Sequence, residues 1–380
     1  MNFFAIGLLL LVGLTDCICK GDKTKPKFGP TGQDVFARKL VVQEPKVKDI
    51  LRESGLYFNN TAKNRFAGDV LGFITPWNTE GFDVAKIFHG KFSMLSPVWL
   101  SFSTGGGMPS KLTTNEIQKR WLYEIRKLNN EDHQVKIYPR VLFESWTVDE
   151  IMGLYRDARR QNDLVASLVE NAKTYQFSGF VMEIWNQFVF SGVNTDTMVS
   201  LVRTISQKLK GHDLDTVLVV PPRGRRIQLF TQDHFDELAP YVKAFSVMTY
   251  DYSSLQRPGA NSPITWAQEC VELLVPDPGP KRAQILLGLN FYGYNFTPQG
   301  GGPIIGANYL KILETFKGKI QWDDRSKEHF FEAKTPTGSG YIFYPTLYSI
   351  QQRLELAEEM GIGISIWEIG QGLNYFYDLF

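Results

Sequence analysis

The chain has 380 residues, of which 43% are hydrophobic and 13% aromatic, a composition that predicts a globular protein with one large domain or two modest ones. Lys and Arg number 41 and Asp and Glu number 40, so the formal net charge is +1. This balance argues against a nucleic-acid partner or an anionic-membrane partner, because both require a one-sided charge field.

The first residues, MNFFAIGLLLLVGLTDCIC (1–19), predict a signal peptide. Their apolar run, residues 3–14, is too short to cross a bilayer, and Cys17 and Cys19 are small enough to precede a cleavage at Lys20. A buried N-terminal helix is the alternative. Since no later run is long and apolar enough, we predict no membrane span and expect a protein that is secreted or delivered to the endolysosomal lumen.

Residues 20–66 are predicted to form a polar leader, basic at first and locally helical near residues 47–54. A solvated tail is the leading interpretation of its basic run, Lys20, Lys23, Lys25 and Lys27, and a docking arm is the alternative. Two glycosylation sequons, at Asn59 and Asn295, fit secretion. Only Cys270 remains after the expected cleavage, so we predict a buried structural thiol and no intramolecular disulfide.

From residue 67 to residue 380, apolar runs alternate with amphipathic helical segments. Near-continuous apolar runs indicate strands that are covered on both faces, and hence a parallel sheet. Eight such runs favour a closed (β/α)8 TIM barrel over an open doubly wound sheet, and no Gly-x-Gly-x-x-Gly follows the first run. The predicted strands are residues 69–75, 92–102, 134–143, 179–185, 216–221, 242–250, 285–291 and 362–367.

Local signals add detail to this barrel. Thr113 with Glu116, and Thr147 with Glu150, fit capping boxes at the start of two helices. An insertion at residues 294–345, between the seventh and eighth strands, is predicted to contain a β-hairpin over the barrel mouth. We do not count it as a separate domain.

Functional residues of such a barrel lie at the carboxyl ends of its strands. Here these ends bring Trp or Tyr together with carboxylates and amides, a combination that stacks on a pyranose ring and bonds its hydroxyls. For Trp77, Trp99 and Trp146, packing in the core is the stronger interpretation. The candidate ligand-binding residues are Trp77, Glu144, Glu183, Trp185, Tyr250, Asp251, Asn290, Tyr292, Trp367 and Glu368. The five His residues show no metal-like spacing, so we predict neither a metal nor a cofactor.

Three runs carry a resemblance to a known family: Met-Thr-Tyr-Asp at 248–251, Gly-Leu-Asn-Phe-Tyr-Gly at 288–293 and Ser-Ile-Trp-Glu at 365–368. Over residues 67–380 the chain resembles glycoside hydrolase family 18, the chitinases and chitinase-like lectins. The resemblance implies that Trp367 forms a floor beneath the central sugar. It also implies that the Tyr-Asp pair at 250–251 holds the N-acetyl group of that sugar.

The fourth strand departs from this family. Active members resemble one another in Asp-Gly-x-Asp-x-Asp-x-Glu, where this chain has SGFVMEIW at residues 178–185, so that Trp185 stands in place of the catalytic Glu. Strand alternation predicts that Trp185 points into the barrel and fills the space of the scissile oxygen. An indole N–H donates a hydrogen bond but supplies no acid, and losing a general acid costs about 10²–10⁴ in rate. We therefore predict no catalytic residue.

The leading hypothesis is a noncatalytic protein that binds N-acetylglucosamine-type oligosaccharides such as chitooligosaccharides. One alternative is an atypical glycosidase that uses Glu183 or Glu144. The other is a protein-interaction scaffold with a vestigial cleft, for which a sorting receptor is the candidate partner.

Overall fold

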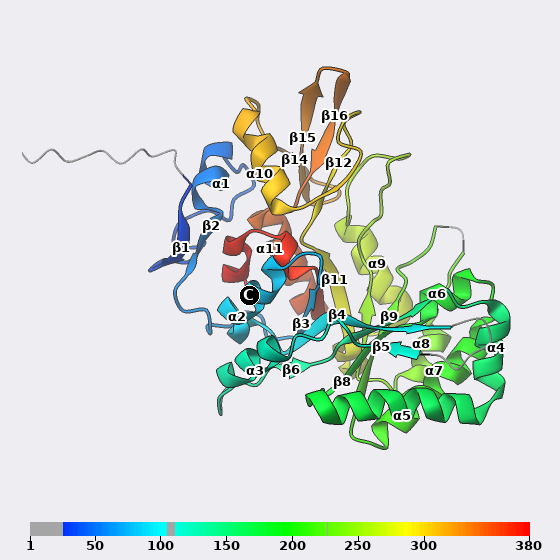
Figure 1. Cartoon of the computed structure of the whole chain (residues 1–380). Coiled ribbons are helices and arrows are strands. Elements are labelled where there is room, and N and C mark those ends of the chain that lie inside the picture. Colours follow the sequence, from blue (N-terminus) through cyan, green and yellow to red (C-terminus); the bar gives the residue numbers. More distant parts are fainter. Residues whose placement is uncertain (1–25, 105–110, 226) are drawn as a thin grey trace, which may run out of the picture.

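The computed structural model describes residues 26–104, 111–225 and 227–380 (Figure 1). The predicted signal peptide, residues 1–19, lies outside these described residues. Within the described ranges, eight parallel strands form the barrel: β3 (Val70–Ile74), β4 (Met94–Ser103), β7 (Arg140–Glu144), β8 (Gly179–Glu183), β9 (Asp215–Val220), β10 (Ala244–Val247), β11 (Ile285–Asn290) and β17 (Gly363–Trp367). Because β3 pairs with both β4 and β17, the barrel is closed, which confirms the predicted (β/α)8 architecture.

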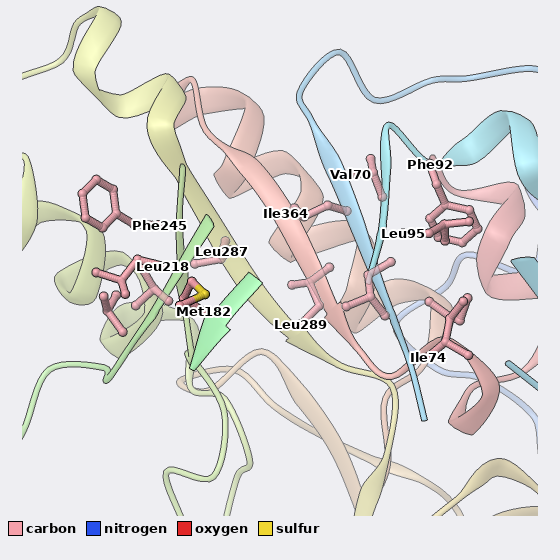
Figure 2. Packing of buried hydrophobic residues seen from close by; sticks show 14 of the residues in the cluster. Val70, Ile74, Phe92, Leu95, Met182, Leu218, Phe245, Leu287, Leu289 and Ile364 are labelled. Carbon is pink, nitrogen blue, oxygen red and sulfur yellow. The ribbon is translucent and has the colours of Figure 1, made fainter. Parts of the chain in front are cut away.

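The barrel has two layers of apolar packing. Side chains alternate along each strand, so Val181 lies in the interior cluster with Val217, while Met182 packs outward with Leu218. Figure 2 shows this outer layer, in which buried side chains of β3, β8, β9, β10 and β11 lie between the strands and the helices. Both faces of the strands are therefore apolar, which explains their near-continuous hydrophobic sequence.

Helices cover the outside of the barrel and the ends of its strands (Figure 1). They are α2 (Glu80–Ile87), α3 (Lys119–Leu128), α4 (Val148–Arg156), α5 (Ala158–Tyr175), α6 (Trp185–Phe190), α7 (Thr195–Lys210), α8 (Gln232–Leu238), α9 (Ile264–Leu274) and α11 (Leu347–Met360). Short 3-10 helices are η1 (His89–Lys91), η2 (Pro280–Gln284), η3 (Ile369–Gln371) and η4 (Asn374–Asp378). No helix of the described residues is long and apolar enough to cross a membrane.

One predicted helix start is confirmed and the other is wrong. The Thr147–Glu150 capping box opens α4. Thr113, in contrast, ends the short strand β5 (Lys111–Thr113), which pairs antiparallel with β4, and α3 begins only at Lys119. In α9, Cys270 is buried as predicted, and its Sγ accepts a hydrogen bond from the Arg223 N–H (3.2 Å).

The insertion between β11 and β17 is larger than a hairpin. The predicted hairpin is present as β15 (Glu328–Thr335) and β16 (Gly338–Phe343), and these strands extend into a five-stranded antiparallel sheet. The other strands of this sheet are β12 (Gly293–Asn295), β13 (Gly302–Ile304) and β14 (Gln321–Asp323), and the insertion also contains the helix α10 (Gly306–Thr315). The buried carboxylate of Glu328 fixes this sheet to the barrel, because it pairs with Arg353 (3.1 Å) and accepts the Asn261 N–H (2.9 Å).

The N-terminal segment from residue 26 to residue 66 is folded against the barrel. Of the predicted basic run, Lys20, Lys23 and Lys25 lie outside the described residues, so the interpretation of that run as a solvated tail or a docking arm stays a prediction. The folded segment contains β1 (Phe28–Thr31), α1 (Val47–Glu53) and β2 (Gly55–Phe58). The short strand β6 (Lys136–Ile137) does not belong to this segment and pairs with β4. Val35 and Ile50 are buried in the main core. Arg38 pairs with Glu53 (3.0 Å) and with Asp378 (3.2 Å) of η4, which ties this segment to the end of the chain.

Candidate functional site

Trp367 lies at the mouth of the barrel, at the carboxyl end of β17. Its ring packs on Phe73 of β3 (centroids 5.3 Å apart) and contacts the interior apolar cluster, and the side chain is half-buried. The guanidinium of Arg140 lies over the same ring, 4.7 Å from its centroid. Such a contact is a cation–π interaction, so the aromatic surface at the mouth is partly covered by a charged group of the chain itself.

Arg140 also forms an ion pair with Glu183. Arg140 begins β7 and Glu183 ends β8, and the register of these neighbouring strands sets Leu142 beside Glu183. The two side chains are only 12% and 16% exposed. Burial lowers the pKa of Arg140 to about 10, so its guanidinium remains charged at neutral pH. A carboxylate in such a pair accepts hydrogen bonds and has no proton to donate.

Asp251 follows β10 and is held from three directions. Its backbone N–H donates to Asn261 Oδ1 (2.7 Å), and its Oδ1 accepts the phenol protons of Tyr292 (2.5 Å) and Tyr294 (3.0 Å). Burial, together with the Asp251 charge, raises the pKa of Tyr292 well above its ordinary value, so that phenol remains a donor. The Asp251 carboxylate is exposed and fixed in orientation, as a ligand-binding acceptor requires.

Of three further candidates, Glu368 and Asn290 have structural roles and Tyr250 packs beside Tyr292. Glu368 is fully buried and accepts hydrogen bonds from Asn78 Nδ2 and from the Gly370 N–H (3.0 Å), at the start of η3. Burial raises its pKa to about 7. Asn290 is buried and donates to the Tyr292 carbonyl (2.8 Å), which fixes the backbone of that tyrosine. Tyr250 is half-buried beside Tyr292, with ring centroids 6.3 Å apart.

Two further candidates are exposed. Trp77, in the loop after β3, is 68% exposed, so the interpretation that it packs in the core is wrong. Glu144 ends β7 and lines an open groove of about 470 Å³ together with Trp146 and Gln187. Trp146 itself is buried, and its Nε1 donates to the Phe102 carbonyl (2.9 Å).

Trp185 does not lie at the mouth, and the prediction that it points into the barrel is wrong. Strand alternation ends at Glu183, because Ile184 has helical dihedral angles and α6 begins at Trp185. The Trp185 side chain is fully buried outside the barrel, where it donates to the Leu229 carbonyl (3.1 Å) and meets the Phe230 ring edge-on (4.8 Å). The indole therefore belongs to the outer core.

Two residues of the site were missed by sequence analysis. Arg140 carries a charge at an inward-facing position of β7, two residues before Leu142 and four before Glu144. Because alternate residues of a strand share a face, this spacing in the sequence could have identified Arg140 as a site residue. Tyr294 stands two residues after Tyr292 and donates to the same Asp251 oxygen. The described residues contain no group of three or more side chains that could hold a metal ion.

A closed parallel barrel with aromatic and carboxylate side chains at its carboxyl ends is the arrangement of a (β/α)8 barrel protein with its site at the mouth. The chain matches the model of the glycosyl hydrolases family 18 over residues 69–372, and it belongs to that family.

Solved structures support the same fold. The class V chitinase from Pseudomonas fluorescens Pf-5 has 19% sequence identity and a TM-score of 0.67, covering 82% of this chain and 98% of that chain. The spore cortex-lytic enzyme SleL from Bacillus megaterium QM B1551 has 18% identity and a TM-score of 0.65, covering 84% and 74%. A family 18 chitinase from Cycas revoluta, solved in complex with (GlcNAc)3, has 15% identity and a TM-score of 0.66, covering 82% and 98%.

Proposed function

We propose that this protein binds oligosaccharides of the N-acetylglucosamine type, such as chitooligosaccharides, without hydrolysing them. The observation that carries this proposal is the ion pair between Arg140 and Glu183 at the mouth of the barrel. Glu183 is the acid of the fourth strand that stands closest in sequence to the family's catalytic position. Paired with a permanently charged guanidinium, it is a poor proton donor to a leaving oxygen.

The position of the family's catalytic Glu supports the same conclusion. By resemblance that position is Trp185, whose side chain is buried in the outer core. Trp185 therefore neither supplies an acid nor obstructs the mouth. Without a general acid, a rate lower by about 10²–10⁴ is expected, which leaves binding as the activity that the remaining residues support.

Asp251 is the best-formed polar contact for a ligand. Both phenols donate to its Oδ1, so Oδ2 is available to an N–H or O–H group of a sugar. Trp367 and the exposed Trp77 supply aromatic surface for pyranose rings. Because Arg140 covers part of the Trp367 ring, we expect modest affinity for a single sugar and a need for several sugar units.

The test is an isothermal titration of the purified protein with chitotetraose. Trp367→Ala and Asp251→Asn should each weaken binding at least tenfold, while Phe28→Ala on β1 serves as the control for loss of an exposed aromatic side chain. Saturable heat that returns to baseline supports a binding protein. A heat signal that decays as sugar is consumed would refute the noncatalytic proposal, and the absence of any heat would refute the proposed ligand and favour the scaffold alternative.

A second candidate function, an atypical glycosidase, rests on Glu144. Its carboxylate is exposed and lines the groove of about 470 Å³ at the end of β7. If chitotetraose is hydrolysed, Glu144→Gln should abolish product release and Glu183→Gln should not.

We further propose a narrower placement for the chain. The runs at residues 66–78, 328–332 and 365–380 resemble the family branch called chitinase domain-containing proteins. Residues 1–19 support secretion or endolysosomal delivery. Of the two sequons, Asn59 is exposed, whereas the Asn295 side chain accepts hydrogen bonds from Thr297 of its own sequon. Mass spectrometry of the protein from a secretory host should find glycan at Asn59.

A further inference from the structure

A second binding site lies on the helix layer, away from the barrel mouth. A groove of about 420 Å³ separates α3 from the carboxyl end of α5, two helices on the same side of the barrel (Figure 1). It is lined by Lys119, Leu122, Tyr123, Arg126, Lys127, Thr174, Tyr175 and Gln176. Three of these residues are cationic, and no Asp or Glu of the described residues lines the groove. This local excess contrasts with the formal net charge of +1 for the whole chain.

The two lysines of this groove lie against aromatic rings. The Lys127 ammonium lies 4.4 Å from the centroid of the Tyr123 ring, and the Lys119 ammonium lies 5.8 Å from that of Tyr175. Arg126 donates to the carbonyls of Tyr175 and Gln176, which fixes the groove wall at the end of α5. Lysines that are already restricted lose less conformational freedom when an anion binds.

The acid of α3 faces elsewhere. Glu124 pairs with Arg120 (2.8 Å) and with Lys86 (3.4 Å), on the side of the helix away from the groove. Neither Lys119 nor Lys127 forms an ion pair with any described residue. Both ammonium groups are therefore available to an external anion.

The spacing of the lysines indicates a polymer. Lys119, Tyr123 and Lys127 recur every four residues and lie along one stripe of α3, so the Cα atoms of the two lysines are about 12 Å apart along the helix. A chain with repeated anionic groups can place one group at each lysine. Thr174 and Gln176 add hydroxyl and amide groups at the groove wall, as a sugar chain requires.

We propose that this groove binds a sulfated glycan chain lying along α3. The site is recessed between two helices, which suits an extended chain better than the flat surface of a bilayer. Sulfate groups contact Lys119 and Lys127, and sugar hydroxyls meet Thr174 and Gln176. The inference is independent of the proposed function, because the groove shares no residue with the barrel mouth.

The experiment measures fluorescence polarisation of a labelled heparin octasaccharide with the full protein. The double variant Lys119→Ala, Lys127→Ala should bind at least tenfold more weakly. The control Lys311→Ala, Lys319→Ala removes the same charge from two exposed lysines of the insertion and should bind as the parent does. Binding should weaken with added salt and disappear with the desulfated octasaccharide.

Three outcomes would overturn the proposal. These are no binding by the parent protein, equal losses in the test and control variants, or binding to phosphatidylserine vesicles without binding to the octasaccharide, which would assign the groove to a lipid surface. Thermal unfolding of each variant verifies that the fold is intact. Titration of the double variant with chitotetraose, which should match the parent, separates this site from the barrel mouth.

Discussion

The ion pair between Arg140 and Glu183 offers the most direct test of the site as described. The changes are Arg140→Met, Glu183→Gln and the two together, which remove the charges; Gln has the length of Glu, and Met replaces the aliphatic part of Arg. Removing one partner of a buried pair costs about 3–5 kcal/mol, because the other charge stays buried without compensation. Both side chains retain some exposure, 12% and 16%, so we expect about 3 kcal/mol for each single variant.

The double variant should be much more stable than the sum of the single losses predicts. With neither charge present, no unpaired ion remains, and the coupling between the two sites should be about 2 kcal/mol or more. Unfolding entropy of about 2.1 cal/mol/K per residue means that 3 kcal/mol corresponds to about 4 °C in a chain of 380 residues. Thermal unfolding followed by circular dichroism resolves such a difference.

The result that would refute this reasoning is additivity. If the double variant loses the sum of the two single losses in Tm, Arg140 and Glu183 do not stabilise one another. Glu183 would then lack the partner that the noncatalytic proposal requires. The control pair Arg120→Met, Glu124→Gln, which alters a surface ion pair whose arginine is 93% exposed, should show little coupling.

Three other predictions concern stability. Burial raises the pKa of Glu368 from 4.5 to about 7, so folding favours the protonated form of its carboxyl group. This preference stabilises the folded state by about 3 kcal/mol below pH 4.5, and the stabilisation is lost as the pH rises to 7. Glu368→Gln should remove this pH dependence from a plot of Tm against pH. If the plots for the variant and the parent protein run parallel, the pH dependence does not come from Glu368. Burial lowers the pKa of His329 from 6.5 to about 4, so its contribution is complete above pH 6.5 and lost as the pH falls to 4. His329→Gln should flatten the acid side of the same plot, and an unchanged acid side would show that another group is responsible. Thr147→Ala should cost about 1 kcal/mol in denaturant unfolding by removing the capping box of α4, with Thr147→Ser as the control that retains it.

The barrel was predictable because its strands are buried on both faces. The runs expected at 285–291 and 362–367 became β11 (Ile285–Asn290) and β17 (Gly363–Trp367). The largest difference is the run at 134–143, which splits into β6 (Lys136–Ile137) and β7 (Arg140–Glu144). Pro139 lies in the gap and has no N–H to donate to a neighbouring strand.

The site was harder to predict because its side chains are placed by the ends of the strands. The period of two that places Val181 inside the barrel could be extended to residue 185 only if the strand continued, and the helical dihedral angles of Ile184 end it. Partners from different strands are equally invisible in a sequence. Nothing near Glu183 in the chain indicates that Arg140, 43 residues earlier, lies beside it in space.

The ion pair and the displaced tryptophan have one consequence for how the mouth uses binding energy. An enzyme gains rate only from contacts that are stronger in the transition state than in the bound substrate. Here Asp251 keeps its orientation through Tyr292 and Tyr294, and the Glu183 carboxylate is paired with Arg140, so Glu183 has no proton to give to a leaving oxygen. This arrangement supports the proposed function, in which the mouth binds an undistorted sugar and the energy of its contacts contributes to affinity rather than to bond cleavage.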